Sequence, residues 1–217
     1  MKGATQVRAA TIAVAVGALT TGLMSAPAHA AAAKGETFTR SYTLVKEFNS
    51  KPLKRCARLT VWGSVTFTRT QGPGFYLIYK NIKVNNPTAR VSALAKCGSK
   101  KSSTLTKGTI TQRWYESSCK ANVKVAVGFP WAVSVEPTVE CGNRRVGKRK
   151  TTYTGTAKTY TQYNSGRPLS FTGTLYAGPS VKQPPAPLCL SAKPTITIYA
   201  KSKSDSFTTT MKACVKP

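Results

Sequence analysis

Histidine and acidic residues are scarce in this sequence, and their scarcity limits the chemistry that the chain can carry. The single histidine, His29, lies in an N-terminal segment with the features of a signal peptide, and only six Asp and Glu stand against 33 Lys and Arg. Without histidine the commonest general base is missing, so neither a Ser-His-Asp nor a Cys-His site can be assembled. Six scattered carboxylates suit neither a Ca²⁺ cage nor the carboxyl pair of a glycosidase. We therefore expect no catalytic residue and no cofactor.

The sequence also lacks an apolar run long enough for a membrane-spanning helix. Residues 9–23 are apolar but weakly hydrophobic, whereas such a helix needs roughly 20 strongly apolar residues. Lys2 and Arg8 precede this stretch, and Ala28 and Ala30 follow it with the A-x-A spacing that a signal peptidase recognises. This pattern predicts a signal peptide cleaved after Ala30, against the alternative of an uncleaved amphipathic anchor.

Cleavage would divide the chain into a signal peptide, residues 1–30, and a secreted β-rich protein, residues 31–217. Loss of the two leader cations lowers the formal net charge from +27 to +25. A folded surface with that imbalance attracts polyanions strongly. We expect an extracellular location, with retention at the cell wall as one option, and no integral membrane span. The expected partner is an anionic polymer or envelope surface, and the oligomeric state is left open.

Residues 31–217 show no 3.6-residue stripe of an amphipathic helix, whereas period-two alternation recurs along them. Leu59, Val61, Val65 and Phe67, for example, alternate with mostly polar residues, as in a strand with one buried and one wet face. Gly, Pro, Asn and Ser gather in the breaks between such stretches, which indicates turns. The pattern predicts strands at 36–48, 56–69, 74–84, 88–96, 104–115, 119–128, 131–141, 150–163, 167–178, 194–201 and 206–215.

These short strands predict an all-β protein, namely an antiparallel β-sandwich or a barrel-like domain. The alternative is two small β domains, divided near residues 98–104, where the sequence reads GSKKSST. The stretch NNP at 85–87 predicts a turn between two strands, and KQPPAP at 182–187 predicts an extended polyproline-like connector.

Six cysteines follow the leader, and an even number in a secreted chain predicts three disulfides. Metal binding is the competing interpretation, but no pair has C-x-x-C spacing and no histidine is available outside the leader. A hairpin that turns near residues 129–130 would bring its two flanking cysteines within the roughly 3.5–4.5 Å between Cβ atoms that a disulfide needs. The expected pairs are Cys119–Cys141, Cys189–Cys214 and, by elimination, Cys56–Cys97.

The strongest local charge is the run RRVGKRK at residues 144–150, which holds five cations and no acid. Its position just before a predicted strand indicates a basic loop outside the core. Arg binds phosphate and carboxylate groups bidentately, which favours an anion grip, whereas a loop that only keeps the protein soluble is the alternative. The candidate binding cations are Arg144, Arg145, Lys148, Arg149 and Lys150.

Aromatic residues near cations offer platforms on which sugar rings or bases can stack. Tyr153 and Tyr160 follow the basic run on opposite faces of the predicted strand, so one of them is expected in the core. Trp62 lies on the polar face of its strand beside Arg58, with packing under a neighbouring loop as the alternative. We therefore add these four residues to the candidate binding site and predict no metal ligands.

Together these features favour a non-enzymatic secreted protein that binds an anionic polymer, such as cell-wall polysaccharide, anionic lipid or nucleic acid. Three other function classes remain. An antimicrobial or toxin-like protein would permeabilise anionic liposomes. A secreted protease inhibitor would present a disulfide-braced loop. A hydrolase is the least favoured, because the sequence supplies no motif for it.

Overall fold

The computed structural model describes residues 35–72, 76–118, 142–166, 168–171, 173–178 and 185–217. Ala33–Pro217 form one compact unit. Within the described residues, regular secondary structure consists of β-strands alone. The segment 98–104 joins two of these strands inside the unit.

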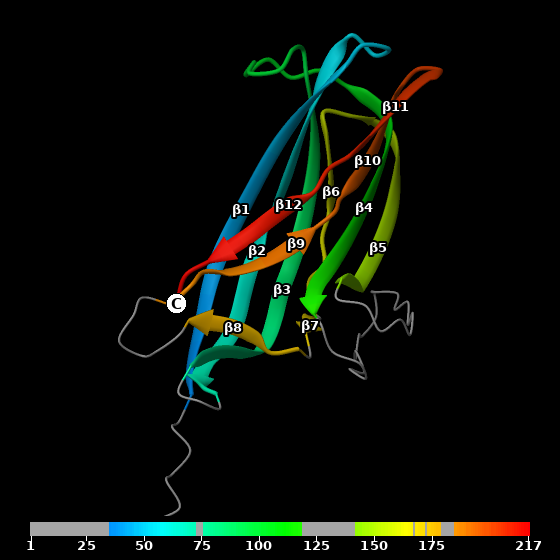
Figure 1. The fold of residues 1–217 in the computed structure, drawn as a ribbon. Coiled ribbons are helices and arrows are strands. Elements are labelled where there is room, and N and C mark those ends of the chain that lie inside the picture. The colour runs from blue at the N-terminus through cyan, green and yellow to red at the C-terminus, as the bar shows by residue number, and fades with distance from the viewer. Residues whose placement is uncertain (1–34, 73–75, 119–141, 167, 172, 179–184) are drawn as a thin grey trace, which may run out of the picture. The chain divides into compact units, whose positions relative to one another are not determined.

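The strands form two antiparallel sheets, which we call sheet A and sheet B (Figure 1). Sheet A consists of β1 (Glu36–Ser50), β2 (Arg55–Gln71), β3 (Leu77–Leu94), β6 (Thr159–Gln162), β7 (Leu169–Phe171) and β8 (Leu175–Gly178). Sheet B consists of β4 (Leu105–Ser118), β5 (Gly142–Ala157), β9 (Leu188–Ala192), β10 (Thr195–Ala200), β11 (Lys203–Thr208) and β12 (Met211–Val215).

Long strands in each sheet pair with shorter strands that follow one another along the same edge. In sheet A, β3 pairs with β2 on one side and with β6, β7 and β8 in succession on the other. In sheet B, β4 pairs with β5 on one side and with β10 and then β9 on the other. The break between β9 and β10 falls at Pro194, which has no N–H to continue the ladder. Thus β4 is a central strand and β5 an edge strand.

Apolar side chains of both sheets pack into one core cluster, which gives the unit a sandwich-like arrangement. Leu59 and Phe67 of β2 contribute from sheet A, and Ile196 and Ile198 of β10 together with Trp114 of β4 contribute from sheet B, all fully buried. Burial of every second residue in β2 follows the alternation in the sequence. The all-β prediction is therefore confirmed, and each sheet keeps one outer face toward solvent.

The predicted turn at residues 85–87 is a bulge inside one continuous strand, β3. The register shifts between Trp62 and Ser64 of β2, where β3 contributes Asn86 and Pro87 against a single residue of its partner. Asn86 has a φ of 45°, a left-handed conformation that asparagine tolerates. A bulge interrupts the ladder and so accepts a proline. The prediction of two separate strands was wrong because turn-forming residues also build bulges.

The basic run 144–150 is the first half of β5, paired along its length with β4. Val146 within it is fully buried and belongs to the core cluster. The prediction of a solvated loop was therefore wrong. A run of charges occurs in loops, but edge strands also often carry Lys and Arg, which oppose pairing with another chain.

Two of the three predicted disulfides are present, and the described residues contain no free cysteine. Cys189 and Cys214 lie opposite each other in the β9–β12 ladder, with their Cα atoms 4.0 Å apart. Cys56 of β2 is joined to Cys97 in the β3–β4 connection. The third predicted pair, Cys119–Cys141, and the two strands predicted between those cysteines lie outside the described residues.

Candidate anion-binding surface

Pairing of β4 with β5 brings three cations together on the outer face of sheet B. Arg113 alternates with Gln112 and Trp114, which are buried, so its side chain lies on the outer face. Lys148 is paired with Arg113, and Lys150 is paired with Thr111 two residues earlier on β4. Paired residues share a face of the sheet, so the three cations are neighbours. We call Arg113, Lys148 and Lys150 the cationic triad.

The triad places two like charges directly opposite each other, an arrangement that destabilises a sheet. The Arg113 guanidinium donates a 2.9 Å hydrogen bond from Nη1 to Thr195 Oγ1 on β10, on the side away from β5. Thr195 Oγ1 in turn shares a 2.9 Å hydrogen bond with Thr208 Oγ1. Hydroxyl groups therefore orient Arg113, but they carry no charge to balance it.

No described acidic side chain lies on this face. The described residues form two ion pairs, Arg58–Glu47 at 2.7 Å and Arg69–Glu36 at 2.8 Å, and both join strands of sheet A. In sheet B, the described carboxylate of Asp205 accepts a 2.8 Å hydrogen bond from Ser50 Oγ of β1, so it does not face the triad. Among the described residues, the triad therefore has no counter-charge.

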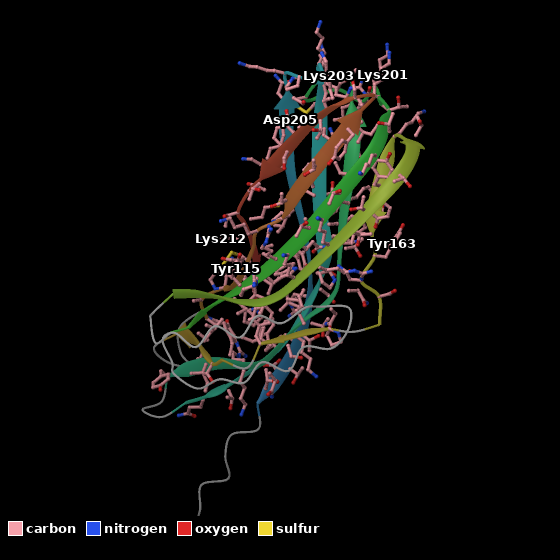
Figure 2. The ribbon with its side chains drawn as sticks, turned by 90° about the vertical axis from the view of Figure 1, so that its right-hand side faces the viewer. Tyr115, Tyr163, Lys201, Lys203, Asp205 and Lys212 are labelled. Carbon is pink, nitrogen blue, oxygen red and sulfur yellow. A yellow bond between two sulfur atoms is a disulfide. The ribbon has the colours of Figure 1, made fainter. Side chains whose placement is uncertain are left out.

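The same face continues across the sheet in rows of paired residues. Tyr115 of β4 is paired with Ser191 of β9, which is paired with Lys212 of β12 (Tyr115 and Lys212 are labelled in Figure 2). On the next strand pair, Lys107 Nζ lies 5.1 Å from the centroid of the Tyr199 ring. The outer face of sheet B thus combines lysines, tyrosines and hydroxyl groups around the triad.

Arg144 and Arg145 precede the triad on β5. Arg145 is half-buried, is paired with Tyr115 and has an interaction partner. Arg144 is paired with Glu116 along the backbone, and its side chain lies outside the described part of the structure.

Arg149, which lies between the two lysines in the sequence, is used differently. Its Nη1 donates to Tyr163 O at 2.8 Å and to Asn164 Oδ1. Asn164 is 1% exposed, and its Nδ2 donates to Pro87 O of β3. The Arg149 guanidinium therefore connects edge strand β5 with the segment that follows β6 in sheet A, and its donors are directed at protein acceptors.

Tyr153 and Tyr160 pack on each other, with ring centroids 5.6 Å apart. Tyr160 is 6% exposed, and its Oη donates to Leu105 O at 3.1 Å. Tyr153 packs against the core cluster, and its Oη donates to Thr161 O at 2.6 Å. The expected alternation is interrupted by a bulge in β5 at Gly155, which has a φ of 100°, and the chain then leaves sheet B after Ala157 and enters sheet A at Thr159. Neither phenol ring forms an open stacking platform.

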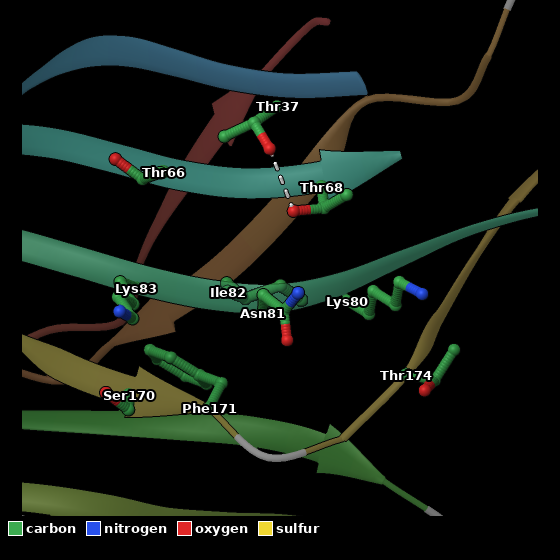
Figure 3. A pocket seen from close by; sticks show the side chains of 10 residues that line it. All are labelled: Thr37, Thr66, Thr68, Lys80, Asn81, Ile82, Lys83, Ser170, Phe171 and Thr174. Atoms are coloured by element: carbon green, nitrogen blue, oxygen red, sulfur yellow. Dashed lines mark hydrogen bonds between the residues drawn. The ribbon is translucent and has the colours of Figure 1, made fainter. Parts of the chain in front are cut away.

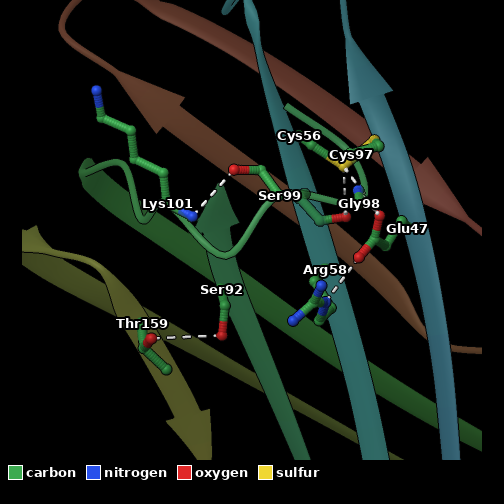
Figure 4. Close-up of polar contacts among 10 residues, drawn as sticks. Glu47, Cys56, Arg58, Ser92, Cys97, Gly98, Ser99, Lys101 and Thr159 are labelled. Atoms are coloured by element: carbon green, nitrogen blue, oxygen red, sulfur yellow. Dashed lines mark hydrogen bonds and ion pairs between the residues drawn. A yellow bond between two sulfur atoms is a disulfide. The ribbon is translucent and has the colours of Figure 1, made fainter. Parts of the chain in front are cut away.

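Arg58 and Trp62 lie in sheet A, away from the triad. Arg58 Nε contacts Glu47 Oε1 at 2.7 Å, and Glu47 Oε2 accepts a 2.7 Å hydrogen bond from Gly98 N (Figure 4). Trp62 is half-buried, and the Arg90 guanidinium carbon lies 4.9 Å from its ring centroid. Both candidate residues are therefore already engaged by neighbouring side chains.

The Glu47 carboxylate lies next to the Cys56–Cys97 disulfide (Figure 4). The Gly98 N–H and the Arg58 guanidinium hold the pKa of this carboxyl below its ordinary value. Its oxygen and the two sulfur atoms lie within 4.8 Å of one another, which is close enough for three metal ligands. However, the sulfur atoms are bonded to each other, and a metal requires thiolates.

Sequence reasoning missed Arg113 and Lys212, although both lie on predicted strands. Arg113 is on the polar parity of its strand, which is a signal that it faces outward. What the sequence alone does not reveal is the pairing partner of that strand, because strands far apart in the sequence pair in sheet B. Of the predicted cations, the structure brings Lys148 and Lys150 together with Arg113.

None of the residues that the structure describes forms a helix with the length and apolar character needed to span a membrane. The chain matches no known protein-family model, and neither curated proteins nor solved structures give a significant match.

Proposed function

We propose that this is a non-enzymatic, secreted protein that binds anionic polymers through the outer face of sheet B. The observation that carries the proposal is the paired position of Arg113 and Lys148, with Lys150 beside them and no described acid on the face. Like charges held together by a backbone ladder repel each other in the free protein. A polyanion laid across them relieves this repulsion and releases its own counterions.

The shape of the site favours an extended polymer over a small ligand. Lys148 and Lys150 are two residues apart on one strand, so their Cα atoms are about 6.6–6.8 Å apart. Lys212 and Tyr115 continue the face across neighbouring strands. A row of cations at regular spacing matches a chain of regularly repeated negative charges, as in a phosphate-linked cell-wall polymer or a nucleic acid.

Secretion is part of this proposal and rests on the leader at residues 1–30. The two disulfides are compatible with an extracellular protein, since such bonds persist in oxidising compartments. We propose Cys119–Cys141 as the third bridge. After export, the polymers of the cell envelope are the nearest anionic molecules, and the strongly cationic mature chain would attract them.

The test replaces the triad with glutamine and measures binding of the mature chain over a salt series. Binding of a fluorescent double-stranded DNA and of purified wall polymer is measured for the parent protein and for R113Q/K148Q/K150Q. The slope of log affinity against log salt should become shallower by about 2–3, since each lost contact with B-DNA contributes about 0.9.

The control K51Q/K100Q/K203Q removes three exposed lysines outside the face, each without a described side-chain partner. It has the same net charge as the triad variant and should retain most of the parent's slope. Equal weakening in both variants would show that bulk charge alone drives binding and that the triad is not a site. Absence of binding by the parent protein at low salt would exclude the proposed function itself.

A further inference from the structure

A second bulge in β3 brings two lysines to the outer face of sheet A. Thr66 of β2 is paired with Lys83, but Thr68 is paired with Lys80, so β3 contains one residue more than β2 over this interval. Residues three apart on a regular strand point to opposite faces. Here the extra residue, with Asn81 at a φ of 54°, places Lys80 and Lys83 on the same face.

The bulge lies beside the gap between β7 and β8, which pair with β3 one after the other on the side away from β2. The bulge and this gap together form a recess of about 680 Å³. β7 pairs with β3 at Ile82, and β8 pairs with it at Tyr79, so no described strand residue pairs with Lys80 or Asn81 on that side. Figure 3 shows Lys80 and Lys83 on either side of Asn81 along β3, with threonines of β1 and β2 on one side and Ser170 and Thr174 on the other. Such a volume is typical of sites for small ligands.

Among the described residues, the recess is lined by hydroxyl, ammonium and amide groups together with Ile82 and Phe171, and by no acid. Thr37 Oγ1 and Thr68 Oγ1 hydrogen-bond to each other at 3.1 Å. In contrast, the side chains of Lys80, Asn81, Lys83, Ser170 and Thr174 form no hydrogen bond or ion pair with any described residue. The recess therefore holds two positive charges and three further polar groups, all available to a ligand.

We propose that this recess binds a phosphorylated polyol, with its phosphate between Lys80 and Lys83 and its hydroxyl groups toward Ser170 and Thr174. Two ammonium groups match a phosphate ester, which carries close to two negative charges at neutral pH. Lysine binds phosphate as a point charge, whereas bidentate carboxylate recognition uses arginine, and no arginine is among the described residues that line the recess.

The apolar part of the recess argues against a ligand that binds by stacking a base or a sugar ring on an aromatic side chain. Phe171 is the one aromatic residue among the described residues that line the recess, and it is 3% exposed, so it offers no open face for stacking. Recognition must therefore come from charge and hydroxyl groups. The site is separate from the cationic triad, which lies on the other sheet, and it goes beyond the polymer binding proposed above.

The experiment titrates the mature chain at low salt with sn-glycerol 3-phosphate, glycerol and inorganic phosphate, using calorimetry. We expect saturable 1:1 binding of the ester, weaker binding of phosphate and none of glycerol. The variant K80Q/K83Q should bind the ester at least about tenfold more weakly, because two charge-assisted hydrogen bonds are lost. The equally charged control K100Q/K203Q should change the affinity by less than about twofold, because exposed, distant charges are screened.

The hydroxyl contacts are tested with S170A/T174V. This variant should bind the ester more weakly than the parent but bind inorganic phosphate with unchanged affinity. Equal weakening by K80Q/K83Q and K100Q/K203Q, phosphate binding as tight as ester binding, or no saturable binding would each overturn the inference. A short glycerol phosphate oligomer distinguishes the source of the ligand. If the oligomer binds more tightly than the single ester, and this gain is lost in K80Q/K83Q but kept in R113Q/K148Q/K150Q, the ligand is a repeat unit of a polymer. If the oligomer and the single ester bind with equal affinity, the ligand is a free ester.

Discussion

Lys148 and Arg149 are adjacent and equally charged, but the structure gives them different roles, which substitution can separate. Arg149 donates to Tyr163 O and to the buried Asn164 Oδ1, so R149Q leaves a buried acceptor without its donor. Hydrogen bonds to charged groups contribute about 1.5–3 kcal/mol each. Because Arg149 is half-exposed and partly solvated, we expect R149Q to lower the free energy of unfolding by about 1–3 kcal/mol in total.

Lys148 has no described partner and faces Arg113, so its loss should hardly affect the fold. We expect K148Q to change the free energy of unfolding by no more than about 0.5 kcal/mol. In DNA binding, K148Q should make the slope of log affinity against log salt shallower by about 0.9. R149Q should leave that slope unchanged, because the guanidinium of Arg149 in the parent is directed at protein acceptors and not at the ligand.

Urea unfolding and DNA-binding anisotropy on the same samples give both readouts. The conservative variant R149K is the internal control, since it keeps the charge but loses the planar fork. It should lose part of the stability and keep the full salt dependence. The assignment would be reversed if K148Q lowered the free energy of unfolding while R149Q left it unchanged and made the slope of log affinity against log salt shallower. That result would contradict the structure of this strand.

Three further changes test other parts of the fold. Burial raises the pKa of Tyr42, and its hydroxyl has no described partner, so Y42F should raise the free energy of unfolding by up to about 1 kcal/mol in urea titrations; a clear loss would reveal a hidden partner. A Cβ atom at Gly108 would lie 2.6 Å from Tyr160 Cδ2, so G108A should cost about 1–3 kcal/mol by thermal unfolding, and an unchanged melting temperature would show that the ring can move. The pKa of Glu47 is lowered in the native state, so the ionised carboxylate stabilises the fold at pH values above its ordinary pKa of 4.5, and this stabilisation is lost as the pH falls through the lower folded pKa. In a plot of the free energy of unfolding against pH, E47Q should therefore show a smaller decrease at acid pH than the parent. An equal decrease in both proteins would assign the loss to other carboxyl groups.

Much of the fold follows from the period of the sequence, whereas the sites depend on where that period is broken. β2 shows the first case, because Leu59 and Phe67 share a parity and both are buried. Lys80 and Lys83 show the second, since their spacing assigns them to opposite faces until a bulge is known. Bulges and sheet crossings arise from tertiary pairing, which local alternation does not encode.

Cysteine positions carried more long-range information than charge did. Cys189 and Cys214 flank the last hairpin in the sequence, and the β9–β12 ladder pairs them directly. In the basic run 144–150, the same local reasoning failed because a charged edge strand and a charged loop have the same composition. The pairing of β5 with β4, which converts this run into part of a surface, is a contact between separate parts of the chain.

The position of Arg113 decides between two explanations of the charge on sheet B. In the first explanation, the lysines on an edge strand serve solely to prevent strands of two molecules from pairing. That role would explain Lys148 and Lys150 on β5. It does not explain Arg113, because β4 is a central strand with both edges already paired. Protection alone predicts that R113Q binds polyanions as the parent does, while K148Q/K150Q self-associates in light scattering. A binding face predicts that R113Q lowers the salt dependence of DNA binding as K148Q does, and that all three variants stay in the parent's oligomeric state.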